Sequence, residues 1–494
     1  MAVHERGGLH LCILMAAAVV FARSTYGGGS RLEFTSSSPE LTRAFSWAKQ
    51  QALAYVHDGD PVGRWYEAAL PGRAAFCMRD VSHQAIGAQA LGLAGYTRNM
   101  LLHFAASIAS SRDWCGFWEI NRFNRPPPED YRDDAHLWYC LPANFDLVDA
   151  CYRMYRWSGD SSYLKDAGFR DFYRHTASDY LARWQLDPSR IMFRPRLPNI
   201  HEPFRPQDIL QMYRGNPSYE EARRDFVLGV DLLAAEHAGF ASYARILDAC
   251  GEERSSRAAQ MRAEALRRLI ESRWWDPGAR RFHAFLTSSG AFAGYDDVNV
   301  LYWRAVGERS EIAAAVKSLE RRARQEPPPN IEVQSHFAEV LYHYGVSDAA
   351  TMQILDLARP NHPRREYPEV SYSVIGAIVT GLIGVDAVEP SLGSTPEVTT
   401  LPMLGGIHSA GIRHLPVRGN VISVEHWHGG SRTRLTNEAG PALLWRPSFR
   451  GACRAILVNG RRMVAHPGSD PAGARTCSTD ILVPNRGFAE ASVL

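Results

Sequence analysis

Apolar residues recur at helical spacing along most of this chain, from about residue 38 to about residue 385. The first helix is predicted to begin at Ser38-Pro39-Glu40, because serine caps helices and proline fits the first helical turn. Further amphipathic runs follow, separated by Gly, Pro, Asn and Asp: 85–104, 147–157, 226–247, 258–274, 312–324 and 333–344. Roughly eleven or twelve helices of ordinary length fit here, and strand-like alternation is nearly absent before residue 395. So many helices exceed a simple bundle and favour paired helices wound into a toroid.

The pattern changes after residues 386–390. Short runs of aliphatic, β-branched and aromatic residues follow at 421–426, 442–445 and 455–458, and Asn459-Gly460 is a hairpin signal. We therefore predict a helical toroid over 38–390 and a small β-domain, a sandwich, over 391–494.

Residues 1–22 are predicted to be a secretion signal. Arg6 supplies positive charge, 9–22 is apolar, and Val20-Phe21-Ala22 fits the small-residue cleavage rule. The apolar run is shorter than a transmembrane helix, although an uncleaved membrane anchor is the alternative. Residues 23–37 are expected to be a spacer. The mature protein is thus predicted to be secreted or periplasmic, without membrane association.

The charge balance argues against nucleic acid as a partner. Lys plus Arg number 55 and Asp plus Glu 53, a formal net charge of +2, so the totals imply no basic face. Composition leaves the oligomeric state open.

The chain contains no recognisable metal or cofactor motif. Its 8 cysteines include no C-x-x-C, and P-loop, dinucleotide and H-E-x-x-H patterns are missing. His426 and His428 would share one face of a predicted strand, but without a third ligand we interpret them as surface histidines. Cys453 and Cys477 are the pair to test first for a disulfide, with two separate buried thiols as the alternative. No metal and no cofactor are therefore expected.

Polar and aromatic residues gather at the starts of several predicted helices, first in 79–84 and then in 114–119 and 133–139. A carbohydrate site needs fixed polar groups for the hydroxyls and flat rings for the C–H faces of a sugar. We therefore predict a carbohydrate ligand. Candidate substrate-binding residues are Arg79, Asp80, His83, Gln84, Trp114, Trp118, Asp134, His136, Trp138, Gln334, His336, Arg364 and Tyr367. The alternatives are a structural ion pair for Arg79 and Asp80, core packing for the tryptophans, and helix capping for 332–336.

Four stretches resemble the six-hairpin, or (α/α)6-toroid, glycosidases, and within them the toroid domain of glycogen-debranching and glucoamylase-type enzymes. The stretches are Arg79-Asp80, the segment from Asn121 to Asp160, Val230-Asp231-Leu232 and Trp274-Trp275-Asp276. The resemblance covers most of 38–385 and implies a mainly α fold, an (α/α)6 toroid, with glycoside hydrolase activity. Those enzymes usually carry a β-domain ahead of the toroid, whereas the predicted β-domain here follows it.

Hydrolysis of a glycosidic bond needs one carboxyl group as acid and a second as base or nucleophile. Glu366, flanked by Arg364, Arg365 and Tyr367, is the predicted base, because neighbouring arginines keep a carboxylate ionised. Asp231 and Glu119 are alternative candidates for the acid, since an apolar helix or an aromatic neighbour would raise their pKa. A helix cap or a buried structural carboxyl is the alternative for all three.

These patterns leave three functions open. The first is a glycoside hydrolase that cleaves an oligo- or polysaccharide, by inversion and without metal. The second is a polysaccharide lyase or sugar epimerase on the same toroid, in which histidine and tyrosine act as acid and base, and His83, His136 and His336 support this interpretation. The third is a non-catalytic glycan-binding protein. The sugar, the linkage and the choice between exo and endo action stay open.

Overall fold

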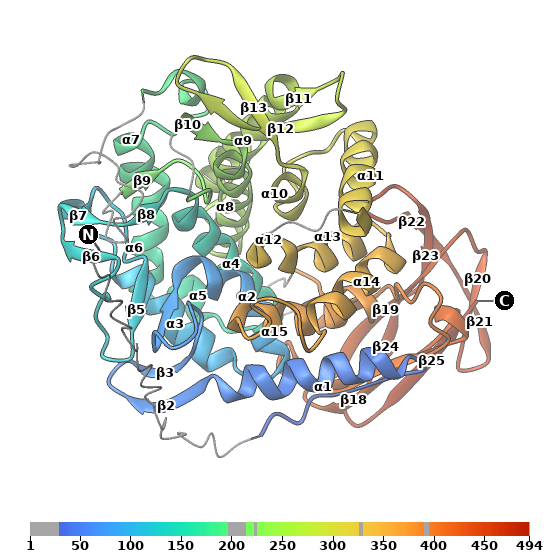
Figure 1. Cartoon of the computed structure of the whole chain (residues 1–494). Helices are drawn as coiled ribbons and strands as arrows, with labels where there is room; N and C mark the ends of the chain where they lie inside the picture. The colour runs from blue at the N-terminus through green and yellow to red at the C-terminus, as the bar shows by residue number, and fades with distance from the viewer. Residues whose placement is uncertain (1–28, 196–213, 222–224, 326–329, 390–394, 494) are drawn as a thin grey trace, which may run out of the picture.

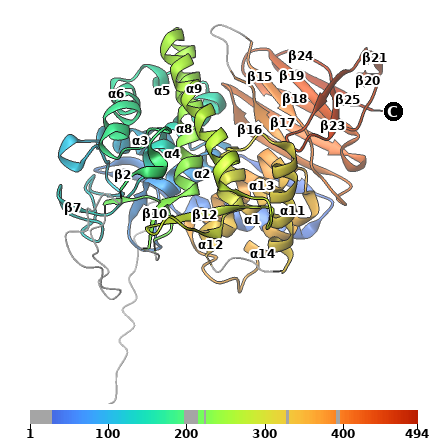
Figure 2. The same ribbon diagram turned by 90° about the horizontal axis from the view of Figure 1, so that it is seen from above.

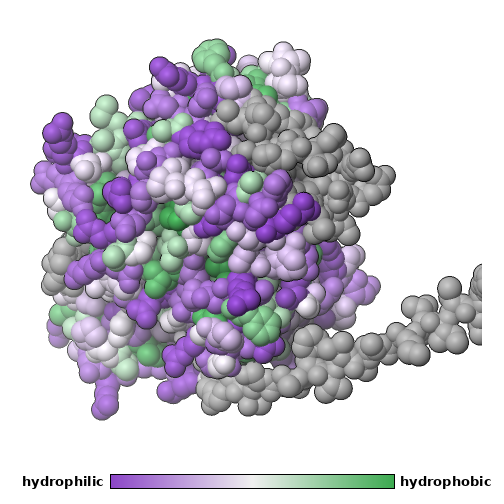
Figure 3. Space-filling view, turned by 90° about the vertical axis from the view of Figure 1, so that its left-hand side faces the viewer, coloured by the Kyte–Doolittle hydropathy of each residue, from purple (hydrophilic) through white to green (hydrophobic). Residues whose placement is uncertain are grey.

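The computed structural model describes residues 29–195, 214–221, 225–325, 330–389 and 395–493. The predicted secretion signal, 1–22, lies outside the described residues. Among the described residues, no helix is both long and apolar enough to cross a membrane. The face at the left of Figure 1 is mainly hydrophilic, with hydrophobic residues scattered over it (Figure 3).

Six helical segments form a closed inner ring. They are α2 (Met78–Ala90), α4 (Pro142–Ser158), α8 (Val230–Ala249), α10 (Asp297–Tyr302), the pair α12 (Ile331–Ser335) and α13 (Phe337–His343), and α15 (Pro368–Ala377). Each segment contacts the next, and α15 returns to α2. Every residue of α2 is buried, as expected for a helix covered on all sides.

An outer layer surrounds this ring (Figure 1). It contains α1 (Pro39–Ala54), α3 (Ala94–Ala106), α6 (Ala167–His175), α9 (Glu253–Leu269), α11 (Arg309–Gln325) and α14 (Ser347–Leu357), with the short α5 (Ser162–Lys165) and α7 (Leu181–Arg183). On α9 only Ala259, Ala263 and Leu266 are buried, one stripe of an amphipathic helix. Outer and inner helices alternate along the chain, which is the pairing that the predicted toroid requires.

The run 85–104 is two helices rather than one. The chain turns at Gly92, whose φ of 85° is readily adopted only by glycine, and α3 begins at Ala94. One helix thus belongs to the inner ring and the next to the outer layer.

Strand-like alternation is nearly absent from the sequence before residue 395, yet the structure contains strands there. Short strands lead into inner helices: β4 (Ala75–Cys77), β8 (Tyr139–Cys140) and β10 (Phe226–Gly229). β5 (Glu119–Asn121) pairs with β4, and β9 (Arg214–Asn216) pairs with β8. Two hairpins are formed by β2 (Val56–Asp60) with β3 (Gly63–Tyr66) and by β6 (Tyr131–Asp133) with β7 (His136–Leu137). A four-stranded sheet combines β10 with β11 (Trp275–Asp276), β12 (Arg281–Thr287) and β13 (Phe292–Tyr295). Most are too short for a period of two to stand out in the sequence, although β12 does alternate in burial.

The C-terminal region consists of two sheets beside the toroid (Figure 2). One sheet contains β16 (Ala410–Val417), β17 (Asn420–Trp427), β18 (Arg432–Ala439), β20 (Ala455–Val458), β21 (Arg461–Val464) and β25 (Phe488–Ser492). The other contains β15 (Glu397–Thr400), β19 (Leu443–Arg450), β22 (His466–Ser469), β23 (Arg475–Ser478) and β24 (Ile481–Val483). Alternate residues of β17 are buried, as on a sheet with one covered face.

Both sheets take a strand from outside 391–494. β1 (Glu33–Ser36), within the expected spacer, pairs with β16, and β14 (Val385–Ala387) pairs with β15. A disulfide joins Cys453 to Cys477, the pair selected from the sequence. The chain segments just before and at the end of the toroid therefore each add a strand to the β-rich region.

Candidate active site

Arg79, in the first turn of α2, is the centre of a buried ion-pair cluster. Its Nη2 lies 2.7 Å from Glu332 Oε2, and its Nε lies 3.4 Å from Asp80 Oδ1. The guanidinium lies over the rings of Trp118 and Tyr219, 5.6 and 5.3 Å from their centres. Carboxylates and aromatic faces thus fix the arginine in one orientation.

His83 lies one turn further along α2, between two carboxyl groups. Its Nε2 is 2.8 Å from Asp146 Oδ2 on α4, and its Nδ1 is 3.6 Å from Glu369 Oε1 on α15. Burial by itself would lower the pKa of His83, but the Asp146 and Glu369 carboxylates outweigh it and raise that pKa to about 9. The imidazole is therefore held in its charged form.

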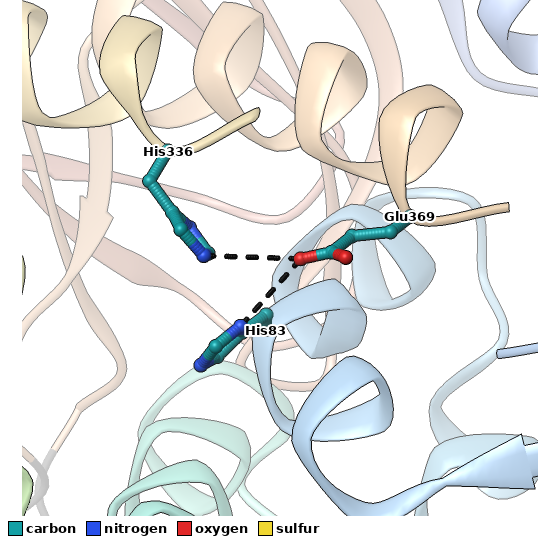
Figure 4. A group of neighbouring side chains, drawn as sticks. All are labelled: His83, His336 and Glu369. Atoms are coloured by element: carbon teal, nitrogen blue, oxygen red, sulfur yellow. Dashed lines mark ion pairs between the residues drawn. The ribbon is translucent and has the colours of Figure 1, made fainter. Parts of the chain in front are cut away.

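His336, between α12 and α13, faces the same point from the opposite side (Figure 4). Its Nε2 is 3.8 Å from Glu369 Oε1, and its ring centre is 4.5 Å from that of His83. Burial and the positive charge of His83 hold the pKa of His336 well below its usual value. The two histidines are thus driven to opposite protonation states.

The carboxyl groups of Glu369 and Glu332 have different surroundings. Glu369 has a side chain only 1% exposed, and burial raises its pKa. Glu332 remains 18% exposed and is held by Arg79 and by the Tyr367 hydroxyl, which donates to its Oε1 at 3.3 Å. Burial and the nearby Glu369 charge also raise the pKa of Asp80 well above its ordinary value. The Glu369 carboxyl group thus has the more buried surroundings, whereas Glu332 is held by two hydrogen-bond donors.

Aromatic rings lie around these polar groups. Tyr219 donates to Asp146 Oδ2 at 3.1 Å, and its ring centre lies 6.2 Å from that of Trp303. Tyr302 packs against His83 and His336, with ring centres 5.4 and 4.5 Å away. Such flat faces beside hydrogen-bonding groups are the features expected of a sugar site.

The toroid topology explains why the cluster forms. Arg79 and Asp80 begin α2, Asp146 lies near the start of α4, and Glu369 is the second residue of α15. Inner helices of successive hairpins run in the same direction, so their first turns gather at one end of the ring. Residues far apart in the sequence therefore meet in one site.

The structure places some predicted residues in the cluster and others outside it. Inside lie Arg79, Asp80, His83, Trp118, His336 and Tyr367. Gln84, on the same helix, is fully buried, and its amide atoms have no hydrogen-bond partner among the described residues.

The predicted base Glu366 is exposed, and its backbone carbonyl accepts a hydrogen bond from Tyr55. Arg364, also exposed, lies over the Tyr367 ring at 5.2 Å. The carboxyl group that lies against His83 is that of Glu369, because α15 begins at Pro368 and carries its first turn into the ring.

The two candidates for the acid are bound outside the cluster. Asp231 Oδ2 accepts from Tyr219 N at 2.6 Å and from Ser218 Oγ at 2.9 Å, and burial raises the pKa of Asp231 to about 7. Glu119 pairs with Arg73 at 2.6 Å, and burial together with Asp130 raises the pKa of Glu119 to about 8. Asp231 thus holds the turn that carries Tyr219, and Glu119 belongs to a separate ion-pair group.

The remaining candidates have other contacts. Trp114 stacks on His175, and Trp138 is half-buried against the core. Arg112 and Tyr131 each donate to Asp134 Oδ1 at 2.7 Å. His136 Nδ1 pairs with Asp133 at 2.8 Å, and Gln334 donates to Asp356 at 2.8 Å.

The interpretation of His426 and His428 as surface histidines was wrong for His426. That side chain is fully buried, and its Nε2 lies 3.0 Å from the carbonyl oxygen of Ile383. His428 follows β17 with a φ of 53°, so the two do not continue one strand face.

Glu221 also belongs to the cluster, because its Oε1 lies 3.4 Å from Arg79 Nη1. Sequence reasoning omitted several members of the cluster from the predicted site: Asp146, Tyr219, Glu221, Tyr302, Trp303, Glu332 and Glu369. Asp146 carried a usable signal, because it is an acidic residue near the start of an apolar helix, as Asp231 is. Tyr219 and Tyr302 carried none, because tyrosines of this kind are common in helical cores.

Solved structures resemble this chain in fold but share little of its sequence. The α-L-rhamnosidase of Dictyoglumus thermophilum matches with a TM-score of 0.60 and 12% identity, over 94% of this chain and 51% of its own. The rhamnosidase of Bacillus sp. GL1 matches with 0.56 and 14% identity, over 81% and 41%. A sialidase matches with 0.55 and 11% identity, over 90% and 41%.

The fold is that of the toroid glycosidases. The chain spans about half, or less, of the length of these three structures. No protein-family model matches it. No curated protein matches it either. The comparisons therefore support the toroid with its β-rich region and leave the reaction to be proposed from the site.

Proposed function

We propose that this protein is a carbohydrate-active enzyme that hydrolyses glycosidic bonds, with Glu332 as the base and Glu369 as the acid. The observation that carries the proposal is the difference between two carboxyl groups in one aromatic-lined site. Arg79 holds Glu332 at 2.7 Å, whereas the Glu369 side chain is only 1% exposed. When two carboxyl groups in one site have such different surroundings, one is suited to donate a proton and the other to accept one.

In the proposed reaction, Glu369 donates its proton to the glycosidic oxygen as the bond from that oxygen to the anomeric carbon breaks, while Glu332 takes a proton from the water that attacks that carbon. Both oxygens of Glu332 already accept hydrogen bonds, from Arg79 and Tyr367. That arrangement favours a base that acts through water over a nucleophile that attacks carbon. Inversion at the anomeric carbon is therefore part of the proposal.

The test is a screen of aryl glycosides, including α-L-rhamnoside because two structures of similar fold are described as rhamnosidases. Glu332→Gln and Glu369→Gln are each expected to lower kcat by ~10²-fold or more on the substrate found. Glu366→Gln is the matched control and should keep near-full activity. If only Glu366→Gln loses activity, the base is Glu366 and not Glu332. The anomer that is released first, identified by its NMR signal, decides between inversion and retention.

A second function has its own supporting observation, the two histidines 4.5 Å apart. The pKa of His83 is raised to about 9 and that of His336 is lowered, which matches an acid and base pair for epimerisation or elimination. Incubation with reducing disaccharides and uronate polymers tests this alternative. A new epimer or an unsaturated sugar, lost in His336→Gln but formed without hydrolysis, would favour it.

Export to an oxidising compartment is also proposed. The Cys453–Cys477 disulfide supports it, because such bonds persist mainly outside the cytosol. Intact-mass measurement on exported protein should give a chain that begins near residue 23.

A further inference from the structure

Three donor atoms in the ring face one another closely enough to share an ion. His83, His336 and Glu369 extend from three different segments toward a common point (Figure 4). Their nearest ligand-type atoms all lie within 4.8 Å of one another. Glu369 Oε1 is 3.6 Å from His83 Nδ1 and 3.8 Å from His336 Nε2.

Two imidazole nitrogens and one carboxylate oxygen form a donor set that suits zinc and related transition-metal ions. Tetrahedral coordination with bonds of ~2.0–2.1 Å places neighbouring donors roughly 3.3 Å apart. The two separations from Glu369 Oε1, 3.6 and 3.8 Å, are slightly longer than this, and all three donors lie within 4.8 Å of one another, so side-chain rotations would have to bring them closer. A fourth position would remain for water or a substrate oxygen.

The surroundings of His83 match those of a metal-binding histidine. Metal ligands of this type commonly direct their second ring nitrogen at a carboxylate, which fixes the ring. Here His83 Nε2 lies 2.8 Å from Asp146 Oδ2, and the Tyr219 hydroxyl donates to the same oxygen at 3.1 Å. That pairing leaves Nδ1 directed at Glu369.

Unpartnered buried atoms at the same point indicate that the site accommodates a further group. His83 Nδ1 and Glu369 Oε2 have no hydrogen-bond partner among the described residues, although the two side chains are 3% and 1% exposed. Polar atoms of buried side chains usually have partners, so unpartnered ones at the point that the three donors share are compatible with a ligand there. An ion at the shared point would take the place of the Nδ1 proton, which passes to solvent, and would bind Glu369 in its carboxylate form.

We propose that His83 Nδ1, His336 Nε2 and Glu369 form a site for one divalent transition-metal ion of the zinc type, with Asp146 positioning His83. The binding itself is independent of the proposed hydrolysis. Its effect on activity rests on the proposed function: a bound ion would withdraw Glu369 from proton donation and so inhibit the reaction.

The experiment uses untagged, chelator-treated protein with Zn²⁺ in calorimetry and Co²⁺ in absorption spectroscopy. Wild type should bind one equivalent of Zn²⁺ and give visible bands of tetrahedral Co²⁺. His336→Gln should lose at least ~10²-fold in affinity, and Asp146→Asn should lose roughly 10–100-fold, as expected for a carboxylate that orients a ligand.

His136→Gln is the matched control, because His136 also pairs with an aspartate but lies outside the cluster. It should bind Zn²⁺ as wild type does, and far-UV circular dichroism checks that each variant is folded. No binding by wild type at millimolar Zn²⁺, or equal binding by folded His336→Gln, overturns the site. Hydrolysis by a protein that binds no metal overturns only the metal proposal, whereas metal binding without any hydrolysis overturns only the proposed function.

Discussion

His83 and Asp146 form an ion pair of 2.8 Å inside the closed helical ring, with Asp146 fully buried. The pair joins α2 to α4, two neighbouring inner helices in extensive contact. Its loss would leave a buried imidazolium without the nearer of its two carboxylate neighbours, which is costly in a region of low dielectric.

Asp146→Asn is therefore expected to lower the free energy of unfolding by about 3 kcal/mol. Urea denaturation measures the change. Asp171→Asn is the control, since Asp171 pairs with Arg174 at 3.1 Å on the exposed surface, where such pairs contribute under about 1 kcal/mol. Equal losses in the two variants would contradict a special role for the buried pair.

Arg79→Lys tests whether the fork of the guanidinium organises the site. Lysine keeps the charge but cannot hold Glu332 and Asp80 together from a planar group. We expect kcat/KM on the hydrolysed glycoside to fall by ~10-fold or more. Arg73→Lys, which alters the separate pair with Glu119, should change kcat/KM little. The prediction fails if the two variants are equally active.

Gly87→Ala should destabilise the toroid where α2 crosses α15. A Cβ at Gly87 would lie 2.2 Å from the Tyr372 carbonyl oxygen, so a helix backbone would have to move. We expect a loss of about 2 kcal/mol or more. At Gly95 on α3 a Cβ would have no other atom within 4 Å, and Gly95→Ala should stabilise by up to about 1 kcal/mol. Melting curves of the two variants compare them directly.

Acidification should weaken the protein through His426. Burial lowers the pKa of this residue to about 4, below its ordinary value of 6.5, although the Ile383 carbonyl opposes the shift. The unfolded chain therefore takes up a proton before the native state does. The contribution of neutral His426 to the free energy of unfolding is complete above pH 6.5. It is lost as the pH falls toward 4, and the total loss is roughly 3 kcal/mol.

Urea unfolding at about pH 7.5 and about pH 5, on either side of the ordinary histidine pKa, measures this contribution. His426→Gln should lack that part of the pH dependence, while His408→Gln, at an exposed position, should retain it. An unchanged pH dependence in His426→Gln would exclude His426 as its source.

The helical toroid could be predicted from the sequence because the patterns that indicate helices are local. Helical spacing of apolar residues and the helix start at Ser38 depend only on nearby residues, and both appear in α1. The same holds for the β-domain, where β17 alternates in burial as its sequence suggests. Short strands such as β4 and β8 were missed because two or three residues are too few to show a period.

The sequence by itself therefore determined the helical repeat, the C-terminal strands and the polar helix starts, and it selected Cys453 and Cys477 as the pair to test first. Which polar residues meet was decided only by the tertiary structure. Glu366 has the more polar neighbours along the chain, Arg365 and Tyr367, yet it is Glu369 that reaches His83, because α15 closes the ring against α2. Ring closure brings side chains together across hundreds of residues, and burial then sets their pKa values, which no local pattern encodes.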